Sequence, residues 1–321
     1  MNSSPAVTVV MPVWNVRPWV AEAIESALTQ TFRDFELIVV NDGSTDGTGE
    51  YLDTLADPRL RVVHQANAGS AAARNVGIAL ARGHYIAFLD GDDRWMPEKL
   101  ERHVRCLDSR PSVDLSFSLS TLIFADGQQI GLQREAPEGT LSFAGLLLDN
   151  KIANGSAVVM RTSTIKEAGG FRAELRACVD LDCWLRVARL RENNVWCLAE
   201  ALTVYRHRPG QITADWRRMR DARKNVMENL GIIGDPQYPG IPGEAESNAH
   251  RWYAWIAYGQ NEFREAVKLA ARSFRLAPWK FLQRADAWLV VSAAVAGMLL
   301  GKDGFTRLRG LARRVRSLCA R

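Results

Sequence analysis

The 321-residue sequence lacks the features that mark several large classes of protein. Its five cysteines are scattered and no two have CxxC spacing, which excludes a disulfide framework and argues against a structural zinc site. The first residues have neither the basic segment nor the apolar core of a signal peptide, so we expect a reducing, cytoplasmic environment. With 47% apolar and 24% charged residues, the composition is that of a globular protein and excludes disordered and fibrous classes.

Common nucleotide-binding and hydrolase motifs are also missing. The sequence has no GxxxxGK[ST] loop, no GxGxxG after its first expected strand and no GxSxG elbow. These absences argue against a P-loop NTPase, a dinucleotide oxidoreductase and a hydrolase with a Ser/His/Asp elbow.

The positive charge is concentrated at the end of the sequence. Residues 302–321 hold seven Lys or Arg and one Asp, a net charge of +6, which leaves −1 for the other 301 residues. The apolar residues of this segment fall on one stripe of a helix and most of the basic residues fall elsewhere, which predicts a basic amphipathic helix. Such a helix either lies on an anionic membrane or packs on the body. The uncharged run before it, residues 287–301, would be about 22 Å long as a helix, short of a bilayer core of about 30 Å. We expect peripheral membrane contact through residues 287–321, and no contact with nucleic acid.

The first hundred residues alternate between strand and helix patterns. Short β-branched runs predict buried strands, and apolar residues at helical spacing predict the helices between them. The expected strands are 7–11, 35–40, 60–64 and 84–89, with helices at 18–30 and 69–81. Repeated units of this kind give an α/β fold with a mainly parallel sheet flanked by helices.

The remainder of the chain is less regular. We expect a helix from Pro97 to about Ser109, strands within 114–130 around a turn at Asp126-Gly127, a strand at 156–161, a helix at 180–191 and a strand at 195–198. From residue 214 onward the pattern is helical, with a Pro/Gly-rich break at 234–243. We therefore expect a catalytic domain at 1–233, with a nucleotide half at about 6–110 and an acceptor half at 111–233, and a helical C-terminal region at 244–321.

Polar side chains follow three of the expected strands. These are Pro12, Trp14 and Asn15 after the first strand, Asp42 and Asp46 after the second, and Asp90, Asp92 and Asp93 after the fourth. Because ligands of open parallel sheets bind at the carboxyl ends of strands, these residues are candidates for one site. An Asp-x-Asp pair there can bind a divalent cation together with substrate phosphates. The alternative is an Asp-rich turn followed by a helix cap.

Four segments in order resemble the signatures of family 2 glycosyltransferases. They are Val9-Val10-Met11-Pro12-Val13-Trp14-Asn15, Val39-Val40-Asn41-Asp42-Gly43-Ser44-Thr45-Asp46-Gly47, Asn67-Ala68-Gly69-Ser70-Ala71-Ala72-Ala73-Arg74-Asn75-Val76-Gly77 and Ala87-Phe88-Leu89-Asp90-Gly91-Asp92-Asp93. The resemblance implies a GT-A fold and an inverting transfer from a nucleotide-diphosphate sugar. It implies that Asp42 accepts hydrogen bonds from the base, that Trp14 stacks on it, that Arg74 lines the nucleotide site and that Asp90 and Asp92 bind Mg²⁺ or Mn²⁺.

A weaker resemblance continues to about residue 210. In Val179-Asp180-Leu181-Asp182-Cys183-Trp184-Leu185, Asp180 matches the family's catalytic base, although Val179 and Cys183 replace the usual Glu and Leu. Without the resemblance, Asp180 could equally cap a helix. Tyr205-Arg206-His207-Arg208-Pro209-Gly210 resembles a Tyr-Arg-x-His-Pro-Gly segment, with His207 one place early. We expect His207 as a metal ligand and Arg208 at the diphosphate, unless the segment is only a surface loop.

The resemblance therefore predicts an enzyme that moves a sugar, expected to be UDP-linked, to a saccharide or lipid-linked acceptor. Its place would be cell-surface polysaccharide or glycolipid synthesis, in the cytoplasm or on the inner face of the membrane. One alternative is a catalytically weak nucleotide-sugar-binding or scaffold protein, which only Val179 suggests. A nucleotidyltransferase is the other, and the missing Gly-rich loop argues against it.

Overall fold

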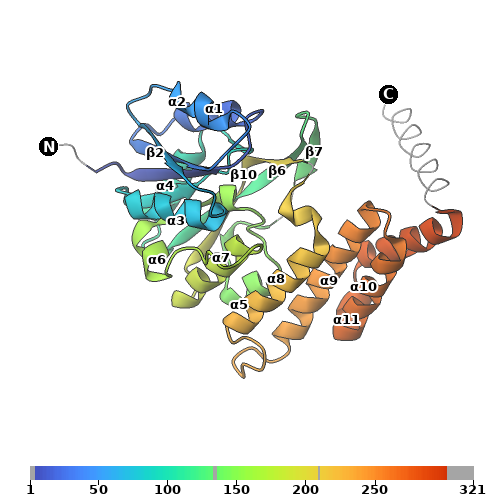
Figure 1. Cartoon of the computed structure of the whole chain (residues 1–321). Helices are drawn as coiled ribbons and strands as arrows, with labels where there is room; N and C mark the ends of the chain where they lie inside the picture. The colour runs from blue at the N-terminus through green and yellow to red at the C-terminus, as the bar shows by residue number, and fades with distance from the viewer. Residues whose placement is uncertain (1–3, 133–135, 209, 302–321) are drawn as a thin grey trace, which may run out of the picture. The chain divides into compact units, whose positions relative to one another are not determined.

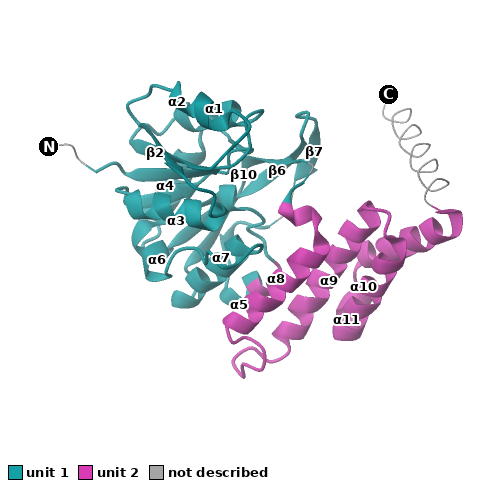
Figure 2. Ribbon diagram, in the orientation of Figure 1, with its two compact units in different colours: residues 1–146, 150–211 teal, residues 147–149, 212–321 magenta. Residues whose placement is uncertain are grey.

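The computed structural model describes residues 4–132, 136–208 and 210–301 (Figure 1). The chain divides into two compact units (Figure 2). Unit 1 comprises the described residues of 1–146 and 150–211, and unit 2 those of 147–149 and 212–301.

Unit 1 is built on one mixed sheet. Its strands are β1 (Val7–Val13), β2 (Phe35–Asp42), β3 (Leu60–Gln65), β4 (Tyr85–Phe88), β5 (Arg94–Trp95), β6 (Leu115–Phe124), β7 (Gln129–Leu132), β8 (Gly139–Thr140), β9 (Val158–Arg161) and β10 (Val195–His207). The helices of the chain are α1 (Val20–Leu28), α2 (Thr48–Asp53), α3 (Ser70–Leu80), α4 (Lys99–Asp108), α5 (Phe143–Leu148), α6 (Thr162–Glu167), α7 (Val179–Leu190), α8 (Trp216–Asn229), α9 (Ile241–Gly259), α10 (Phe263–Leu276) and α11 (Pro278–Leu282), with 3₁₀ turns η1 (Gly155–Ala157) and η2 (Ile212–Ala214).

The strand order brings the ends of distant strands to one edge of the sheet. The order is β3-β2-β1-β4-β9-β6-β10-β5, with β7 beside β6 and β8 beside β10. Strands β1 to β4 are mutually parallel, and β9 is antiparallel to both β4 and β6. Two reversals restore the original direction, so β6 and its parallel neighbour β10 end at the same edge as β1, β2 and β4.

Burial explains why the first half of the chain could be predicted. All seven residues of β1 are buried, and α1 covers the sheet with the predicted stripe of Val20, Ala23, Ile24 and Ala27. Pro12 is tolerated in this central strand because β4 pairs only with residues 7–10, so beyond them only β2 remains as a partner. On α3, a Cβ at Gly77 would lie 2.2 Å from Val10 Cγ1, so glycine permits the helix to approach the sheet.

The second half of unit 1 differs from the expected pattern. The turn at Asp126-Gly127 joins β6 to β7 as predicted, but β10 continues to His207 rather than ending near residue 198. Register shifts between Leu198 and Thr203 interrupt its regular alternation. A bulge of this kind shifts the alternation of buried and exposed residues, so the second part of the strand no longer continues the pattern of the first.

Unit 2 is helical and has its own core. Trp216 of α8 packs in one cluster with Tyr253 of α9 and Phe263 of α10, so the break at 234–243 lies inside this unit. The apolar run is helical over 285–301 and contributes Ala287, Val290 and Ala294 to the same cluster. Within the described residues, no helix has both the length and the apolar character needed to cross a bilayer. The predicted basic helix at 302–321 lies outside the described residues.

Candidate active site

The loops that follow β1 and β2 are tied together at the carboxyl edge of the sheet. Asn15, held at φ 51°, accepts a hydrogen bond from Thr45 N at 2.8 Å through its Oδ1, and its own N–H donates to Ser44 Oγ at 3.1 Å. Pro12 is buried in β1, whereas the Trp14 side chain just beyond it is 54% exposed. Trp14 is therefore free to receive a planar ligand, while Asn15 supports the loop that presents it.

Asp42, the last residue of β2, is buried and organises the segment that leads into α3. Its carboxylate accepts hydrogen bonds from Gln65 Nε2 at 2.7 Å and from the backbone N–H groups of Ala68 and Gly69, both at 2.8 Å. A carboxylate offers about four acceptor positions, so capacity for one ligand donor remains. A structural role for Asp42 is thus evident, and its contact with a base stays a prediction.

Buried Arg74 forms an ion pair with half-buried Asp90, which follows β4. The guanidinium of Arg74 donates through Nη2 to Asp90 Oδ1 and lies over the Phe171 ring at 5.4 Å. The Arg74 Nε is buried and has no hydrogen-bond partner among the described residues. Gly155 approaches closely, since a Cβ there would lie 3.5 Å from Arg74 Nη2. The pair thus combines a buried positive charge with a donor available to an anionic ligand.

Asp92 and Asp93 are fixed by the end of β10. Arg208 donates through Nε to Asp92 Oδ2 at 2.5 Å, and Arg206 donates through Nε to the Asp92 carbonyl at 2.9 Å. Asp93 accepts from the backbone N–H of Arg206 at 2.9 Å and from Ser156 Oγ at 2.5 Å. Pairing of β5 with β10 is the reason, because Arg94 and Trp95, which directly follow Asp93, pair with Val204 and Thr203 near the end of β10.

Burial sets the electrostatics of these carboxylates. Desolvation raises the pKa of Asp92, and the Arg208 guanidinium opposes this while the Asp90 charge adds to it. Desolvation raises the pKa of Asp93 well above its usual value, with further contributions from Asp92 and Asp90. The charged forms of these two carboxylates are therefore disfavoured, and a cation or a donor-rich ligand would stabilise them.

Asp180 lies near the Arg74–Asp90 pair, at the second position of α7. The residue before the helix, Cys178, has φ 54°, and Leu181 N donates to Asp180 Oδ1 at 2.9 Å. Burial raises the pKa of Asp180, the Arg74 charge lowers it and the Asp90 charge raises it further. A carboxylate with a raised pKa is suited to accepting a proton near neutral pH.

Asp182, two residues further along α7, has a different environment. It is fully buried and accepts from Arg172 Nη1 at 3.1 Å and Arg186 Nη2 at 2.7 Å. Two guanidinium partners hold this carboxylate within the fold, so Asp180 and not Asp182 is the candidate base.

His207 is not placed with the acidic cluster. It is exposed at the last position of β10, between Arg206 and Arg208, which both contact Asp92. A contact of His207 with a metal ion stays a prediction. Within the described residues, no group of three or more His, Cys, Asp or Glu side chains is arranged to hold a metal ion.

Two contributors were missed in the sequence. Arg206 belongs to the Tyr-Arg-x-His-Pro-Gly-like segment, so that motif could have identified it. Ser156 lies in the 3₁₀ turn η1, for which the sequence offers no signal.

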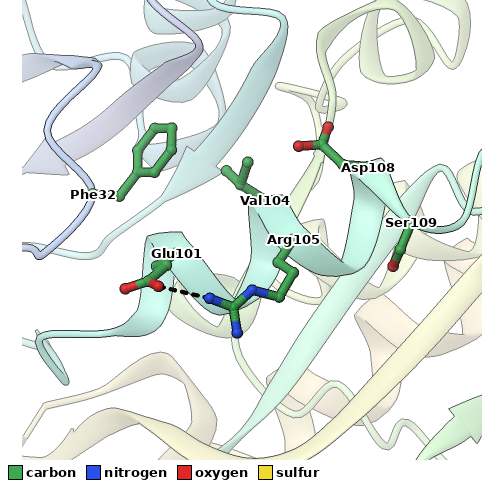
Figure 3. Close-up of a pocket in the computed structure, with 6 residues that line it drawn as sticks. All are labelled: Phe32, Glu101, Val104, Arg105, Asp108 and Ser109. Carbon is green, nitrogen blue, oxygen red and sulfur yellow. Dashed lines mark hydrogen bonds and ion pairs between the residues drawn. The ribbon is translucent and has the colours of Figure 1, made fainter.

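A surface pocket on α4 lies away from this cluster (Figure 3). The Tyr85 hydroxyl, on the first residue of β4, donates to Asp108 Oδ1 at 2.5 Å, which places this pocket at the amino end of the strand. Asp90 follows the carboxyl end of β4, so the pocket is not part of the acidic site. It is lined by Phe32, Glu101, Val104, Arg105, Asp108 and Ser109.

The fold is of the GT-A type. Solved structures with this fold include Staphylococcus aureus TarS, residues 1–349, at a TM-score of 0.61 and 16% identity over 91% of this chain and 90% of that one. Another is the mannosyltransferase PcManGT from Pyrobaculum calidifontis, in complex with GDP-Man and Mn²⁺, at a TM-score of 0.61 and 19% identity over 92% of this chain and 81% of that one. Further TarS structures contain UDP or UDP-GlcNAc.

The sequence comparisons identify the family. The family model described as Glycosyl transferase family 2 matches residues 8–136. Bacillus subtilis TuaG, whose name assigns it to teichuronic acid biosynthesis, is 32% identical over 209 residues, covering 64% of this chain and 80% of TuaG. Other curated relatives are matched over only 15–31% of their own length. This chain belongs to glycosyltransferase family 2, a family of enzymes that transfer sugars.

Proposed function

We propose that this protein transfers a sugar from a UDP-linked donor to a hydroxyl group of a saccharide or lipid-linked acceptor, with inversion at the anomeric carbon. The observation that carries the proposal is the single cluster formed by Asp180, Arg74 and Asp90 next to Asp92 and Arg208. It combines a candidate base with two guanidinium groups that suit a diphosphate. TarS structures with UDP and UDP-GlcNAc support the choice of donor nucleotide.

The chain's own residues would divide the reaction between them. Arg74 and Arg208 would bind the diphosphate through charge-assisted hydrogen bonds, and exposed Trp14 would stack on the base. Asp180 would accept the proton of the attacking acceptor hydroxyl, on the side opposite the leaving group. Inversion follows from one such displacement.

A divalent cation fits the donor set of this site. Asp90 and Asp92 offer carboxylate oxygens, the ligands that Mg²⁺ and Mn²⁺ accept together with substrate phosphates. Burial raises the pKa of Asp92 and Asp93, and a bound cation would favour their ionised forms. When bound, the metal would neutralise the diphosphate and improve it as a leaving group. His207, exposed at the last position of β10, stays a predicted further ligand of the metal.

Calorimetry with UDP, GDP and dTDP, each with and without Mn²⁺, tests this function. We expect metal-dependent binding of UDP to the wild type and its loss in Asp92→Ala, followed by turnover when UDP-sugars and acceptors are screened. Binding without turnover of any UDP-sugar would favour the scaffold alternative. Failure of the wild type to bind any of the nucleotides would contradict the proposal.

We also propose that an anionic membrane surface is the partner of unit 2. The outward face of helix 285–301 is apolar and uncharged, with Trp288 51%, Leu289 59% and Leu299 82% exposed. Buried Phe281 of α11 contacts both Phe274 at 5.7 Å and Trp288 at 5.9 Å, and Phe274 is itself 41% exposed, so a further apolar side chain is exposed close to this face. In the sequence, these exposed apolar residues are followed by a segment of net charge +6. Such a combination suits a membrane, whose anionic head groups cover an apolar interior.

Sedimentation with lipid vesicles tests this contact. We expect binding to vesicles containing phosphatidylglycerol, little binding to pure phosphatidylcholine, and a clear loss in Trp288→Ser/Leu289→Ser. Ile233→Ser is the matched control, since Ile233 is 62% exposed in the same unit but lies outside the apolar face. Equal binding by all three proteins would contradict the proposal, as would a dimer in solution that only the double variant dissociates.

A further inference from the structure

Both carboxylates of the Asp-x-Asp pair hold a guanidinium group. Arg74 pairs with Asp90, and Arg208 pairs with Asp92 with 2.5 Å between Nε and Oδ2. The two side chains of the Arg208–Asp92 pair are 24% and 12% exposed, so they meet in a partly desolvated position. A cation that binds Asp92 must therefore meet a positive charge already in place.

The three arginines around the cluster are held to different degrees. Arg74 belongs to α3 and is buried beneath the Phe171 ring. Arg206 is fixed by Asp92 O, Ala125 O and Glu22 Oε2. Arg208 follows the end of β10, and its guanidinium contacts the Asp92 carboxylate and lies 5.3 Å from the centre of the Trp19 ring. Arg208 is the most exposed of the three, at 24% against 8% for Arg74 and 3% for Arg206, and is therefore the one best able to change its partner.

We propose that Arg208 is an exchangeable counter-ion of Asp92, which opposes binding of a metal ion alone and favours its binding together with a nucleoside diphosphate. This inference rests on the proposed function and describes how the same site is controlled. A bare cation at Asp92 would leave the Arg208 guanidinium beside a second positive charge. A diphosphate supplies an anion to which Arg208 can transfer its hydrogen bond, so the displaced charge is paired again.

The exchange predicts effects of opposite sign on two ligands. In Arg208→Gln, the affinity for Mn²⁺ alone should rise about tenfold, because no guanidinium competes for Asp92. The affinity for UDP in saturating Mn²⁺ should fall about tenfold, because the diphosphate loses its cationic partner. A residue needed only for the shape of the site would weaken both, and a simple diphosphate ligand would leave the affinity for Mn²⁺ alone unchanged.

Titration calorimetry of Mn²⁺ alone, UDP with Mn²⁺, and uridine provides the test. Arg208→Lys keeps the charge and should keep low affinity for Mn²⁺ alone, and uridine, which has no phosphate, should bind all variants equally. Arg102→Gln is the matched control, because the exposed Arg102 side chain of α4 pairs with Glu200 at 3.5 Å. Unfolding temperatures of all variants establish that the fold is intact.

The outcomes separate this inference from the proposed function. The exchange is overturned if Arg208→Gln binds Mn²⁺ alone no more tightly than the wild type does. This holds whatever the variant's affinity for UDP. Absence of nucleotide binding by the wild type would overturn the proposed function, whereas tighter Mn²⁺ binding by the variant would still support the exchange.

Discussion

Units 1 and 2 place charge and apolar surface in opposite ways. Among the described residues, the buried carboxylates all belong to unit 1, namely Asp42, Asp92, Asp93, Asp114 and Asp182. Unit 2 instead exposes most of the large apolar side chains that face solvent, from Ile212 to Leu300. Burying a carboxylate is costly unless its partners are well placed, and exposing large apolar groups together is costly in water.

The difference separates two kinds of function. In unit 1 the costly groups converge on one edge of the sheet, where a charged substrate can bind. In unit 2 the costly groups are exposed apolar side chains, which only another apolar surface can cover. We therefore propose that unit 1 carries the chemistry and unit 2 the membrane contact, and the following variants test that division from the largest expected effect to the smallest.

The strongest test is Asp180→Asn. We expect turnover to fall by about 10² to 10⁴, equivalent to about 3 to 5.5 kcal/mol, because the amide cannot accept the acceptor's proton. Binding of UDP with Mn²⁺ should stay close to that of the wild type, since Asp180 is not placed among the diphosphate ligands. Steady-state kinetics and calorimetry measure the two effects. A variant as active as the wild type would exclude Asp180 as the base.

The pH dependence of the wild type sharpens the same assignment. The proposed base must be ionised to accept a proton, and burial raises the pKa of Asp180 above the usual value, so turnover should fall as the pH decreases through that raised pKa. The acidic limb should therefore begin at a higher pH than for an ordinary Asp. Asp180→Asn should lack this limb in its residual activity.

Trp184→Ala and Trp279→Ala compare the interior of unit 1 with the surface of unit 2. Trp184 is fully buried, with ring centres 5.6 Å from Phe171 and 6.1 Å from Phe88, so its loss should destabilise unit 1 by about 3 to 5 kcal/mol. Trp279→Ala is the control, since Trp279 is 76% exposed and its loss should change stability by less than about 0.5 kcal/mol. Urea unfolding followed by fluorescence measures both, and similar losses would contradict the assigned exposure.

The nucleotide half of unit 1 could be predicted from sequence because its signals are local. The strand patterns that end in Pro12, Asp42 and Asp90 each run into turn-forming or polar residues, and parallel strands bring those ends together. The resemblance added roles that the pattern alone could not assign, such as Asp180 over Asp182. The two guanidinium partners of Asp182 then supplied a physical reason for that choice.

The rest depended on contacts between distant residues. Arg206 reaches Asp92 across 114 positions, after a bulge that conceals the end of β10. Which of His207 and Arg208 faces Asp92 depends on a one-residue register, and such a register is set by pairing rather than by local sequence. The division between the units follows packing of Trp216 on Tyr253, whereas the Pro/Gly-rich break predicted a later boundary.

Ser156→Ala tests how strongly the site depends on support from η1. Ser156 Oγ donates to Asp93 Oδ2 at 2.5 Å and accepts from Asp90 N at 3.0 Å, so the variant leaves two buried groups without this partner. We expect a loss of about 1 to 3 kcal/mol in the free energy of unfolding, with weaker UDP binding in Mn²⁺. Chemical denaturation and calorimetry measure these changes. Unaltered UDP binding would mean that Asp90 and Asp93 hold their positions without η1.

Asp215→Ala, the smallest expected effect, tests whether unit 2 unfolds separately from the chemistry of unit 1. Asp215 caps α8 by accepting hydrogen bonds from the backbone N–H groups of Arg217 and Arg218, each at 3.1 Å. Losing this cap should cost about 1 kcal/mol, because two N–H groups at the start of the helix lose their acceptor. Asp215→Asn, which keeps a side-chain oxygen, should recover most of it. If the units are independent, the loss appears in thermal unfolding of unit 2 while UDP binding is unchanged, and a parallel loss of UDP affinity would show that the two regions are energetically coupled.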